Sequence, residues 1–254
     1  VTFHPTKVIM YPMCAPNRRL ERRLDVVNTV LSRIQNNNGA NKDVQIIDLS
    51  YFEAEEKYME GTGCLIFDHL KKIIYCCVSI RSNTTILKKI AELLQYSFIL
   101  FHANDSNNYP IYHTNVMLTI ASKYIIICED AISDLPGVGT DTESYVMADI
   151  SSKKDVMASF TTCMSTNEGG TIPVSRDIIT ISLEQVGQFA GNMLEVYDKN
   201  GQSYLCMSET ARNCLTPNQI EKIMKYSEII ALPIPTIERY GGGSVRCMMC
   251  EVQY

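Results

Sequence analysis

The sequence predicts an α/β fold made of repeated strand–strand–helix–strand units packed around an axis, in the manner of a propeller. Short apolar runs of strand length recur in pairs, and a helical stripe and a further strand follow most pairs. Small or polar residues open the first strand of successive units, at intervals of roughly 50 to 80 residues, which is a supersecondary repeat period. These openings are Glu60–Gly63, His113–Asn115, Gly191–Asn192 and Gly243–Cys247. Equivalent strand ends converge in such a fold, so we expect the openings to meet.

The first unit begins with the apolar run Lys7–Tyr11, which Pro12 halts, and ends with the strand Val44–Leu49. Between them, Leu20 to Ile34 carries apolar residues three or four positions apart. This spacing predicts a helix that stops at the turn Asn36–Gly39.

The second unit has strands at Gly61–Phe67 and Lys72–Val78, joined by a tight turn. The inward-facing stripe of Thr84–Leu94 predicts a helix, with Asn83 or Thr84 as its cap. Ser97–His102 then returns as a strand.

The third unit pairs Tyr112–Ile120 with Tyr124–Cys128, and its last strand is Asp177–Ile181. Asp130 to Thr171 is less regular, and we expect one or two helices there. Loops are expected around Pro136–Gly137 and Glu168–Gly170.

The last unit pairs Gly191–Val196 with Ser203–Met207 across the hairpin signal Lys199–Gly201. A helix opens at Thr216, has Pro217 in its first turn and runs to Met224. The strand Glu228–Leu232 leads toward three consecutive glycines.

Composition predicts a soluble globular protein. The 254 residues are 46% hydrophobic and 20% charged, and the formal net charge is −5. With no long Lys/Arg block and no apolar run of about 18 residues, we expect no nucleic acid and no membrane as partners. The ten cysteines lack the spacing of a zinc or disulfide framework, which favours a reducing, cytoplasmic compartment and no metal or other cofactor.

The glycines Gly241–Gly243 allow another group to approach the backbone closely, and they lead into an apolar run that suits a buried strand. A cysteine at the mouth of such a strand, Cys247, is a candidate nucleophile. The alternative is a small core residue, because free cysteine is among the most buried residue types.

Three segments, Glu60–Gly63, His113–Asn115 and Gly241–Cys247, resemble in chain order the Glu, His and Cys motifs of the guanidino-modifying enzymes, the penteins. These include arginine deiminases, dimethylarginine hydrolases, arginine dihydrolases and amidinotransferases. The resemblance runs nearly end to end, and it implies an α/β-propeller of repeated ββαβ modules with pseudo-fivefold symmetry. Three segments look closer to one branch, the citrulline-utilisation-type hydrolases once filed as amidinotransferases: Met10–Arg19, Phe189–Met193 and Ile234–Glu238.

That branch carries an upstream strand with an Asn-rich substrate motif before a segment resembling Val1–His4, and Val1–Phe3 reads like the middle of a strand. We therefore expect one catalytic domain over residues 1–254, with an incomplete first module.

The resemblance implies that Cys247 attacks the central carbon of a guanidinium or ureido group as a thiolate. His113 then protonates the departing ammonia and later deprotonates the hydrolytic water. Glu60 accepts hydrogen bonds from substrate N–H groups and helps to hold the imidazole. Each residue alone has an ordinary structural explanation, whereas their order along the chain favours catalysis.

Asn115 departs from the deiminases, which carry Asp two residues after the His. Its amide gives up the charge that would pair with a guanidinium, and its NH₂ can donate to a ureido C=O. This favours citrulline, or arginine carried through a citrulline-like intermediate.

Further polar or flexible positions are candidates for binding the substrate. Asn192 could contact it or cap a strand turn, and Gly242 and Gly243 allow close approach to the backbone. A bidentate clamp on an α-carboxylate, or alternatively a solvated helix face, is expected of Arg18, Arg19 and Arg22.

We therefore predict a cysteine-dependent hydrolase that cleaves C–N bonds of the ureido or guanidino group of citrulline or arginine, toward ornithine and ammonia. One alternative is an amidinotransferase that passes an amidino group from Cys247 to an amine. Another is a non-enzymatic pentein scaffold. The expected partner is a small amino-acid substrate, and a homo-oligomer is left open.

Overall fold

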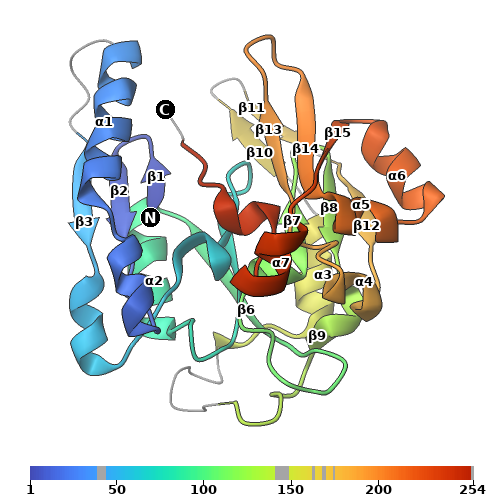
Figure 1. The fold of residues 1–254 in the computed structure, drawn as a ribbon, viewed down its shortest axis with the longest axis horizontal. Helices are drawn as coiled ribbons and strands as arrows, with labels where there is room; N and C mark the ends of the chain where they lie inside the picture. The colour runs from blue at the N-terminus through green and yellow to red at the C-terminus, as the bar shows by residue number, and fades with distance from the viewer. Residues whose placement is uncertain (39–43, 141–148, 162–163, 168–169, 174, 253–254) are drawn as a thin grey trace.

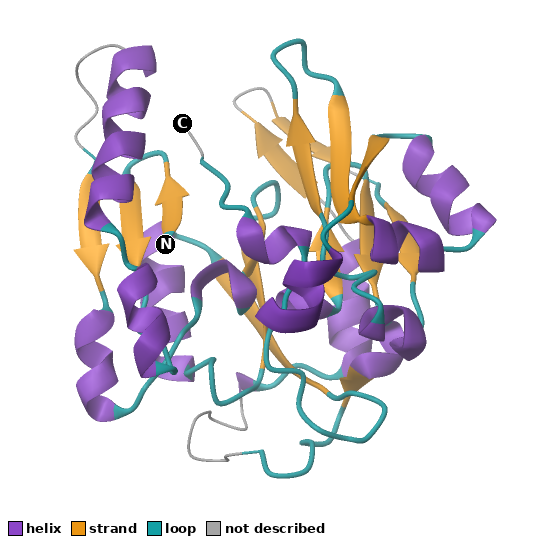
Figure 2. Ribbon diagram, in the orientation of Figure 1, coloured by secondary structure: helices purple, strands orange, loops and turns teal. Residues whose placement is uncertain are grey.

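Strands and helices alternate along the chain in a mixed α/β fold (Figures 1 and 2). The structure is a computed structural model that describes residues 1–38, 44–140, 149–161, 164–167, 170–173 and 175–252. In Figure 1 the strands β1 to β3 and helix α1 stand on the left, and β13 to β15 stand on the right. The C-terminal segment with α7 lies between these two parts.

Four groups of strands in the described part of the chain share one topology. In each group an antiparallel pair is followed by helix and then by a third strand, parallel to the second. The first two groups are β1 (Thr2–His4), β2 (Lys7–Met10), α1 (Leu24–Asn38) and β3 (Gln45–Asp48), then β4 (Ile66–Asp68), β5 (Ile73–Cys77), α2 (Thr84–Leu94) and β6 (Ser97–Ala103). The other two are β7 (Leu118–Ile120), β8 (Tyr124–Ile127), α3 (Lys153–Thr161) and β12 (Asp177–Thr180), then β13 (Leu194–Tyr197), β14 (Ser203–Ser208), α5 (Glu209–Cys214), α6 (Pro217–Met224) and β15 (Glu228–Leu232). Their arrangement about a pseudo-fivefold axis stays a prediction.

Two helices form where local sequence signals predict them. Helix α2 starts after Asn83, whose side chain accepts hydrogen bonds from the backbone N–H groups of Thr85 and Ile86. Helix α6 starts after Thr216, which forms a reciprocal capping box with Gln219. These caps satisfy backbone donors that the first helical turn leaves unpaired.

The core lies on the middle strands of the groups. The strand β8 is fully buried along its length, and Tyr75 of β5 and Leu205 of β14 belong to the same apolar cluster. Asp68, at the end of β4, forms a buried ion pair with Arg176, which immediately precedes β12. This pair joins the second group of strands to the third.

The first helix differs from its prediction. A 3₁₀ helix, η1 (Pro16–Glu21), comes first, and α1 begins at Leu24 and runs to Asn38. Leu20 is 81% exposed, so it contributes nothing to the buried stripe. Of the turn expected at Asn36–Gly39, residues Asn36–Asn38 are helical, and Gly39 lies outside the described residues.

Three predicted strand beginnings are short 3₁₀ helices instead: η3 (Gly61–Gly63), η4 (Thr114–Val116) and η8 (Val245–Met248). Strand prediction fails here because these short apolar and small-residue segments have no ladder partner among the described strands. Gly61 has a φ of +53°, which an extended strand does not adopt. Cys247 thus lies on a helical turn.

Sequence reasoning missed several short elements. The region 130–171 contains α3, as expected, but also β9 (Ile132–Ser133) at the edge of β6 and the hairpin of β10 (Met164–Asn167) and β11 (Gly170–Pro173). The loop predicted at Glu168–Gly170 falls mainly on residues outside the described part. Five further helices were not predicted: η2 (Ser50–Glu55), η5 (Glu129–Ala131), α4 (Leu183–Gly187), α5 and α7 (Pro235–Gly241).

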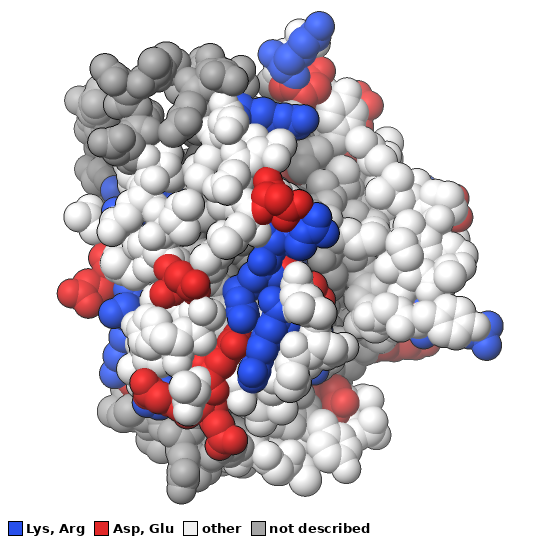
Figure 3. All heavy atoms as spheres, turned by 60° about the vertical axis from the view of Figure 1, so that its left-hand side comes forward, with Lys and Arg blue, Asp and Glu red and all other residues white. Residues whose placement is uncertain are grey.

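The surface carries both signs of charge. On the face in Figure 3, Lys and Arg side chains lie next to Asp and Glu side chains in a central band. Within the described ranges, the structure contains no helix with the length and apolar character needed to cross a bilayer.

Candidate active site

One cavity of about 1180 Å³ collects most of the residues that the sequence singled out. The openings of the second, third and fourth units and the turn η8 all contribute to its wall, and η1 covers one side. The predicted residues that line it are Arg18, Arg22, Glu60, His113, Asn115, Asn192, Gly242, Gly243 and Cys247. Arg19 does not line it. The expected convergence of distant openings is therefore what the structure shows.

Glu60 is the electrostatic centre of the cavity wall. Its side chain is 1% exposed, and its Oε2 atom contacts His113 Nε2 at 2.8 Å and a terminal guanidinium nitrogen of both Arg18 and Arg81 at 3.1 Å. Oε1 accepts the backbone N–H of Cys14. Burial alone would raise the pKa of Glu60, but the hydrogen bond and charge of His113 and the two arginines outweigh it and lower the pKa to about 2.

His113 immediately precedes η4 and is 8% exposed. Its ring packs against Gly63, where an added Cβ would lie 3.1 Å from ring atoms, and beside the ring of Tyr112. Burial lowers the pKa of His113 below its usual value, and the hydrogen bond and charge of Glu60 act in the opposite direction. Glu60 therefore orients the imidazole and keeps it easier to protonate than burial alone would.

Cys247 is exposed to the cavity from η8. Ser244, one turn earlier, is fully buried and donates a hydrogen bond to Glu238 of α7. The backbone of Gly243 packs on the cysteine, since an added Cβ would lie 3.0 Å from both its Cβ and its sulfur. Because Cys247 is exposed, it is not the small core residue that the sequence also allowed.

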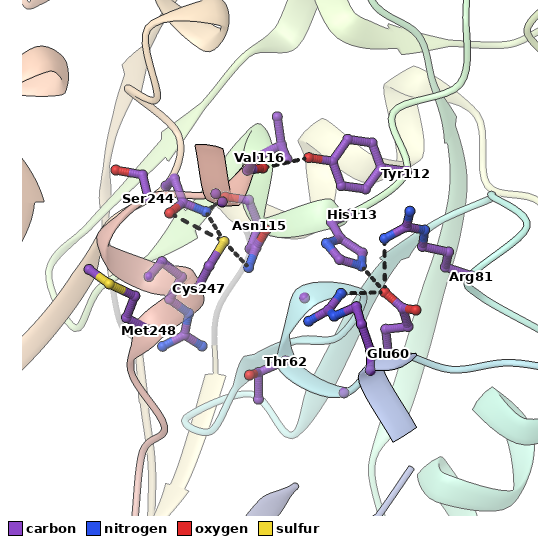
Figure 4. A pocket seen from close by; sticks show the side chains of 18 of the residues that line it. Glu60, Thr62, Arg81, Tyr112, His113, Asn115, Val116, Ser244, Cys247 and Met248 are labelled. Carbon is purple, nitrogen blue, oxygen red and sulfur yellow. Dashed lines mark hydrogen bonds and ion pairs between the residues drawn. The ribbon is translucent and has the colours of Figure 1, made fainter. Parts of the chain in front are cut away.

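The sulfur and the imidazole face the same cavity from two sides, with Asn115 between them in Figure 4. Nδ2 of Asn192 lies 3.3 Å from the sulfur, and Nδ2 of Asn115 lies 3.7 Å from it. Among the described residues, no hydrogen bond joins the sulfur to His113. Oδ1 of Asn115 is buried and has no hydrogen-bond partner in this part of the chain.

The three N-terminal arginines are already paired with carboxylates. Arg18 forms a fork with Glu21 at 3.0 and 3.1 Å in addition to its contact with Glu60. Arg22 and Arg19 both pair with Glu53. The α-carboxylate of a substrate would have to compete with Glu21 and Glu53 for these arginines. The predicted carboxylate clamp therefore requires the arginine side chains to leave their present partners.

Arg81 is a cavity residue that sequence reasoning missed. Its guanidinium contacts Glu60 and lies over the ring of Tyr112, 5.0 Å from the centroid. Its buried Nε has no hydrogen-bond partner within the described ranges. The predicted hairpin of the second unit could have identified Arg81. In an antiparallel pair the start of the first strand adjoins the end of the second strand. Accordingly, the backbone N–H of Glu60 donates to the carbonyl of Arg81.

Other described cysteines are poor candidates for a nucleophile. Burial raises the pKa of Cys64 and of Cys76 well above its usual value. Cys250 is exposed, but its sulfur points to the backbone carbonyl of Val1. The described residues contain no group of three His, Cys, Asp or Glu side chains arranged to hold a metal ion.

Chemically, the cavity offers a nucleophilic sulfur, a titratable imidazole and a buried carboxylate around an open volume. The amide of Asn115 lies beside the sulfur through its Nδ2, its buried Oδ1 has no hydrogen-bond partner among the described residues, and arginine side chains line the cavity. This combination suits covalent chemistry on a small polar group that presents N–H donors.

Comparison with known proteins gives one family and several structural neighbours. Residues 1–254 match the model of the family described as N,N dimethylarginine dimethylhydrolase, eukaryotic. A search of curated proteins found no match. Apo ArgZ, an arginine dihydrolase from the ornithine–ammonia cycle in Cyanobacteria, is similar with a TM-score of 0.63 at 14% identity, over 100% of this chain and 32% of that chain.

A variant of the N-terminal domain of ArgZ, covalently bound to a reaction intermediate, has a TM-score of 0.61 at 15% identity, over 100% of this chain and 72% of that chain. SxtG, an amidinotransferase from Microseira wollei in the saxitoxin pathway, has a TM-score of 0.54 at 11% identity, over 97% of this chain and 64% of that chain. The chain thus has the mixed α/β fold of the guanidino-modifying superfamily, and it spans about a third of the length of full ArgZ.

Proposed function

Because the chain belongs to the family described as eukaryotic N,N dimethylarginine dimethylhydrolase, we propose that it is a cysteine-dependent hydrolase of the guanidino group of arginine or an N-substituted arginine. The products are the ureido compound and ammonia or the corresponding amine. The observation that carries the proposal is the meeting of Cys247, His113 and Glu60 on one cavity.

The reaction begins when the Cys247 thiolate adds to the central guanidinium carbon and forms a C–S bond. One C–N bond then breaks, and the departing nitrogen takes a proton from the imidazolium of His113. The neutral imidazole next removes a proton from water, whose oxygen adds to the same carbon. The C–S bond breaks and the thiolate returns, and the oxygen from water releases its remaining proton to solvent as it becomes the ureido C=O.

Glu60 supports both halves of this cycle. Its carboxylate is ionised and holds His113 through a 2.8 Å hydrogen bond. The same oxygen pairs with the guanidinium groups of Arg18 and Arg81, so it lies in a place that accepts planar N–H donors. A substrate guanidinium fits this environment by exchanging with one of these arginines.

The family match supports a guanidino substrate over a ureido one, because the description of the family names a methylated arginine. Nδ2 of Asn115 faces the sulfur, whereas its Oδ1 is buried without a partner among the described residues. Guanidinium and ureido groups both carry N–H donors, so this oxygen does not distinguish between them. The substrate proposed here is therefore arginine or an N-substituted arginine, in place of the citrulline expected from the amide alone.

Arg81 is the candidate anchor for an α-carboxylate. Only one of its terminal nitrogens is used by Glu60 in the described structure, and its Nε is without a partner. In contrast to Arg18, its fork is not occupied by a second carboxylate. A planar guanidinium with free donors suits bidentate recognition of a carboxylate.

The test is an assay of the purified protein with arginine, asymmetric Nω-dimethylarginine and citrulline. Ammonia, dimethylamine, citrulline and ornithine are measured for the wild type, Cys247→Ser and the matched control Cys214→Ser, which alters a thiol on α5 outside the cavity. We expect turnover of a guanidino substrate that only Cys247→Ser abolishes. Formation of guanidinoacetate when glycine is added would instead establish the transferase, and equal activity of Cys247→Ser would refute the proposal.

A further inference from the structure

The sulfur of Cys247 sits among side-chain amides. Asn192 presents both of its polar atoms to the sulfur, Nδ2 at 3.3 Å and Oδ1 at 3.6 Å. Asn115 adds a second amide nitrogen at 3.7 Å (Figure 4). The imidazole of His113 is engaged with Glu60 through Nε2. In the described structure the thiol is therefore contacted by amides, and the charged pair lies apart from it.

The amide of Asn192 is fixed independently of the sulfur. The residue is 2% exposed, and Nδ2 also donates to the backbone carbonyl of Asn115 at 3.0 Å. This second bond sets which end of the amide is the nitrogen, because a carbonyl oxygen in that place would face another acceptor. Asn192 thus has a defined donor aimed at the sulfur.

The backbone around Asn192 is equally constrained. Its N–H donates to the carbonyl of Phe189. At Gly191 an added Cβ would lie 2.3 Å from the carbonyl oxygen of Val116, so this loop is pressed directly onto η4. The loop 189–192 and η4 therefore form one rigid support that carries both amides.

We propose that Asn192 is a positioning residue for the nucleophile: it fixes the sulfur of Cys247 and donates a hydrogen bond that favours the thiolate. The chemical role of that thiolate rests on the function proposed above. An amide N–H stabilises a charged acceptor more than a neutral one, whereas Oδ1 can accept the S–H of the thiol. Asn192 therefore acts through its contact with the reacting sulfur.

Alkylation of the free protein tests this without turnover. Iodoacetamide labelling of Cys247 is followed by peptide mass spectrometry between pH 5 and pH 10 in the wild type, Asn192→Leu and Asn192→Asp. Leucine keeps the approximate size and removes the donor, so we expect the rate at pH 7 to fall about tenfold and the midpoint of the profile to rise by about one pH unit. Aspartate adds a negative charge beside the sulfur, so its midpoint is expected to rise further.

Loss of a hydrogen-bond donor raises the midpoint of Asn192→Leu, whereas a residue that only fills space would leave that midpoint at the wild-type value. The negative charge of Asn192→Asp raises the midpoint in either case and shows that the side chain reaches the sulfur. Asn218→Asp, on the exposed start of α6, is the matched charge control and should keep the wild-type profile. If Asn192→Leu does not fold, Asn192→Ala, which removes the same donor, is measured in its place. Wild-type profiles in the folded Asn192 variants would overturn the proposal.

The outcome is separable from that of the enzyme assay. A protein that hydrolyses no guanidino compound but shows the expected alkylation order would refute the proposed function and keep the role of Asn192. A protein that turns over arginine, but whose two Asn192 variants keep the wild-type alkylation profile, would support the proposed function and refute the role of Asn192.

Discussion

Nε2 of His113 lies 2.8 Å from Oε2 of Glu60, and these two residues stand 53 positions apart in the chain. The contact joins the opening of the second unit to that of the third. Both side chains are almost completely buried, yet the cavity is open beside them. Arg18 and Arg81 contact the same carboxylate oxygen, so the imidazole belongs to a network of charged side chains. Single substitutions in this network test what each charge contributes.

The pKa of His113 should fall when Glu60 is neutralised. Burial lowers this pKa, and Glu60 raises it through its hydrogen bond and charge, so Glu60→Gln removes the opposing effect. NMR titration of the imidazole Cε1–H signals measures the change. His4, His69 and His102 serve as internal controls, and an unchanged or higher value for His113 would contradict the role of the carboxylate.

Acid should destabilise the wild type more than Glu60→Gln. The pKa of Glu60 is lowered from 4.5 to about 2 in the folded protein, so between these pH values the unfolded chain binds more protons. The stabilising contribution of Glu60 is then fully present above pH 4.5 and is lost as the pH falls toward 2. Urea unfolding at a series of pH values measures it, and a variant with the same steep decline as the wild type in this window would disprove the coupling.

Gly63→Ala should impair catalysis with little loss of structure. The added methyl would lie 3.1 Å from the ring of His113 and would displace it by a few tenths of an ångström. Because small displacements of a catalytic group are costly, we expect kcat to fall about tenfold or more. Gly187→Ala, whose methyl meets nothing within 4 Å, is the control. Equal kcat values for the two variants would show that the imidazole can give way freely.

Arg81→Gln should reduce discrimination between arginine and agmatine, which lacks the α-carboxylate. A hydrogen bond to a charged group contributes about 1.5–3 kcal/mol, so we expect the ratio of kcat/KM for arginine to that for agmatine to fall at least about tenfold. Effects through Glu60 would reduce both substrates equally and leave the ratio unchanged. Arg239→Gln, on the exposed face of α7, is the matched control for lost charge.

Much of the fold was predictable because its signals are local. The cap at Asn83 and the apolar stripe after it define α2 from consecutive residues, and the Thr216 to Gln219 box does the same for α6. The hairpin between β13 and β14 follows from a turn sequence. The order of Glu60, His113 and Cys247 along the chain also indicates the candidate chemistry, since each belongs to a short local motif.

The turns at the cavity were predicted less well. Apolar and small residues at η3, η4 and η8 look like strand beginnings, since burial against another unit and burial within a sheet leave the same pattern in sequence. For Asn192 the sequence suggested a substrate contact or a strand cap, and it gave no sign of the contact with the sulfur. Arg19 was grouped with Arg18 and Arg22, although it lies outside the cavity lining.

The sequence by itself determined the order of the strands and helices and which residues carry reactive groups, because caps, turns and apolar periodicity act between near neighbours. Tertiary structure alone decided which of these groups touch. Glu60 meets His113 across 53 residues, and Asn115 meets Cys247 across 132. Such contacts depend on how the units pack against one another, and packing between distant segments leaves no periodic pattern in a single chain.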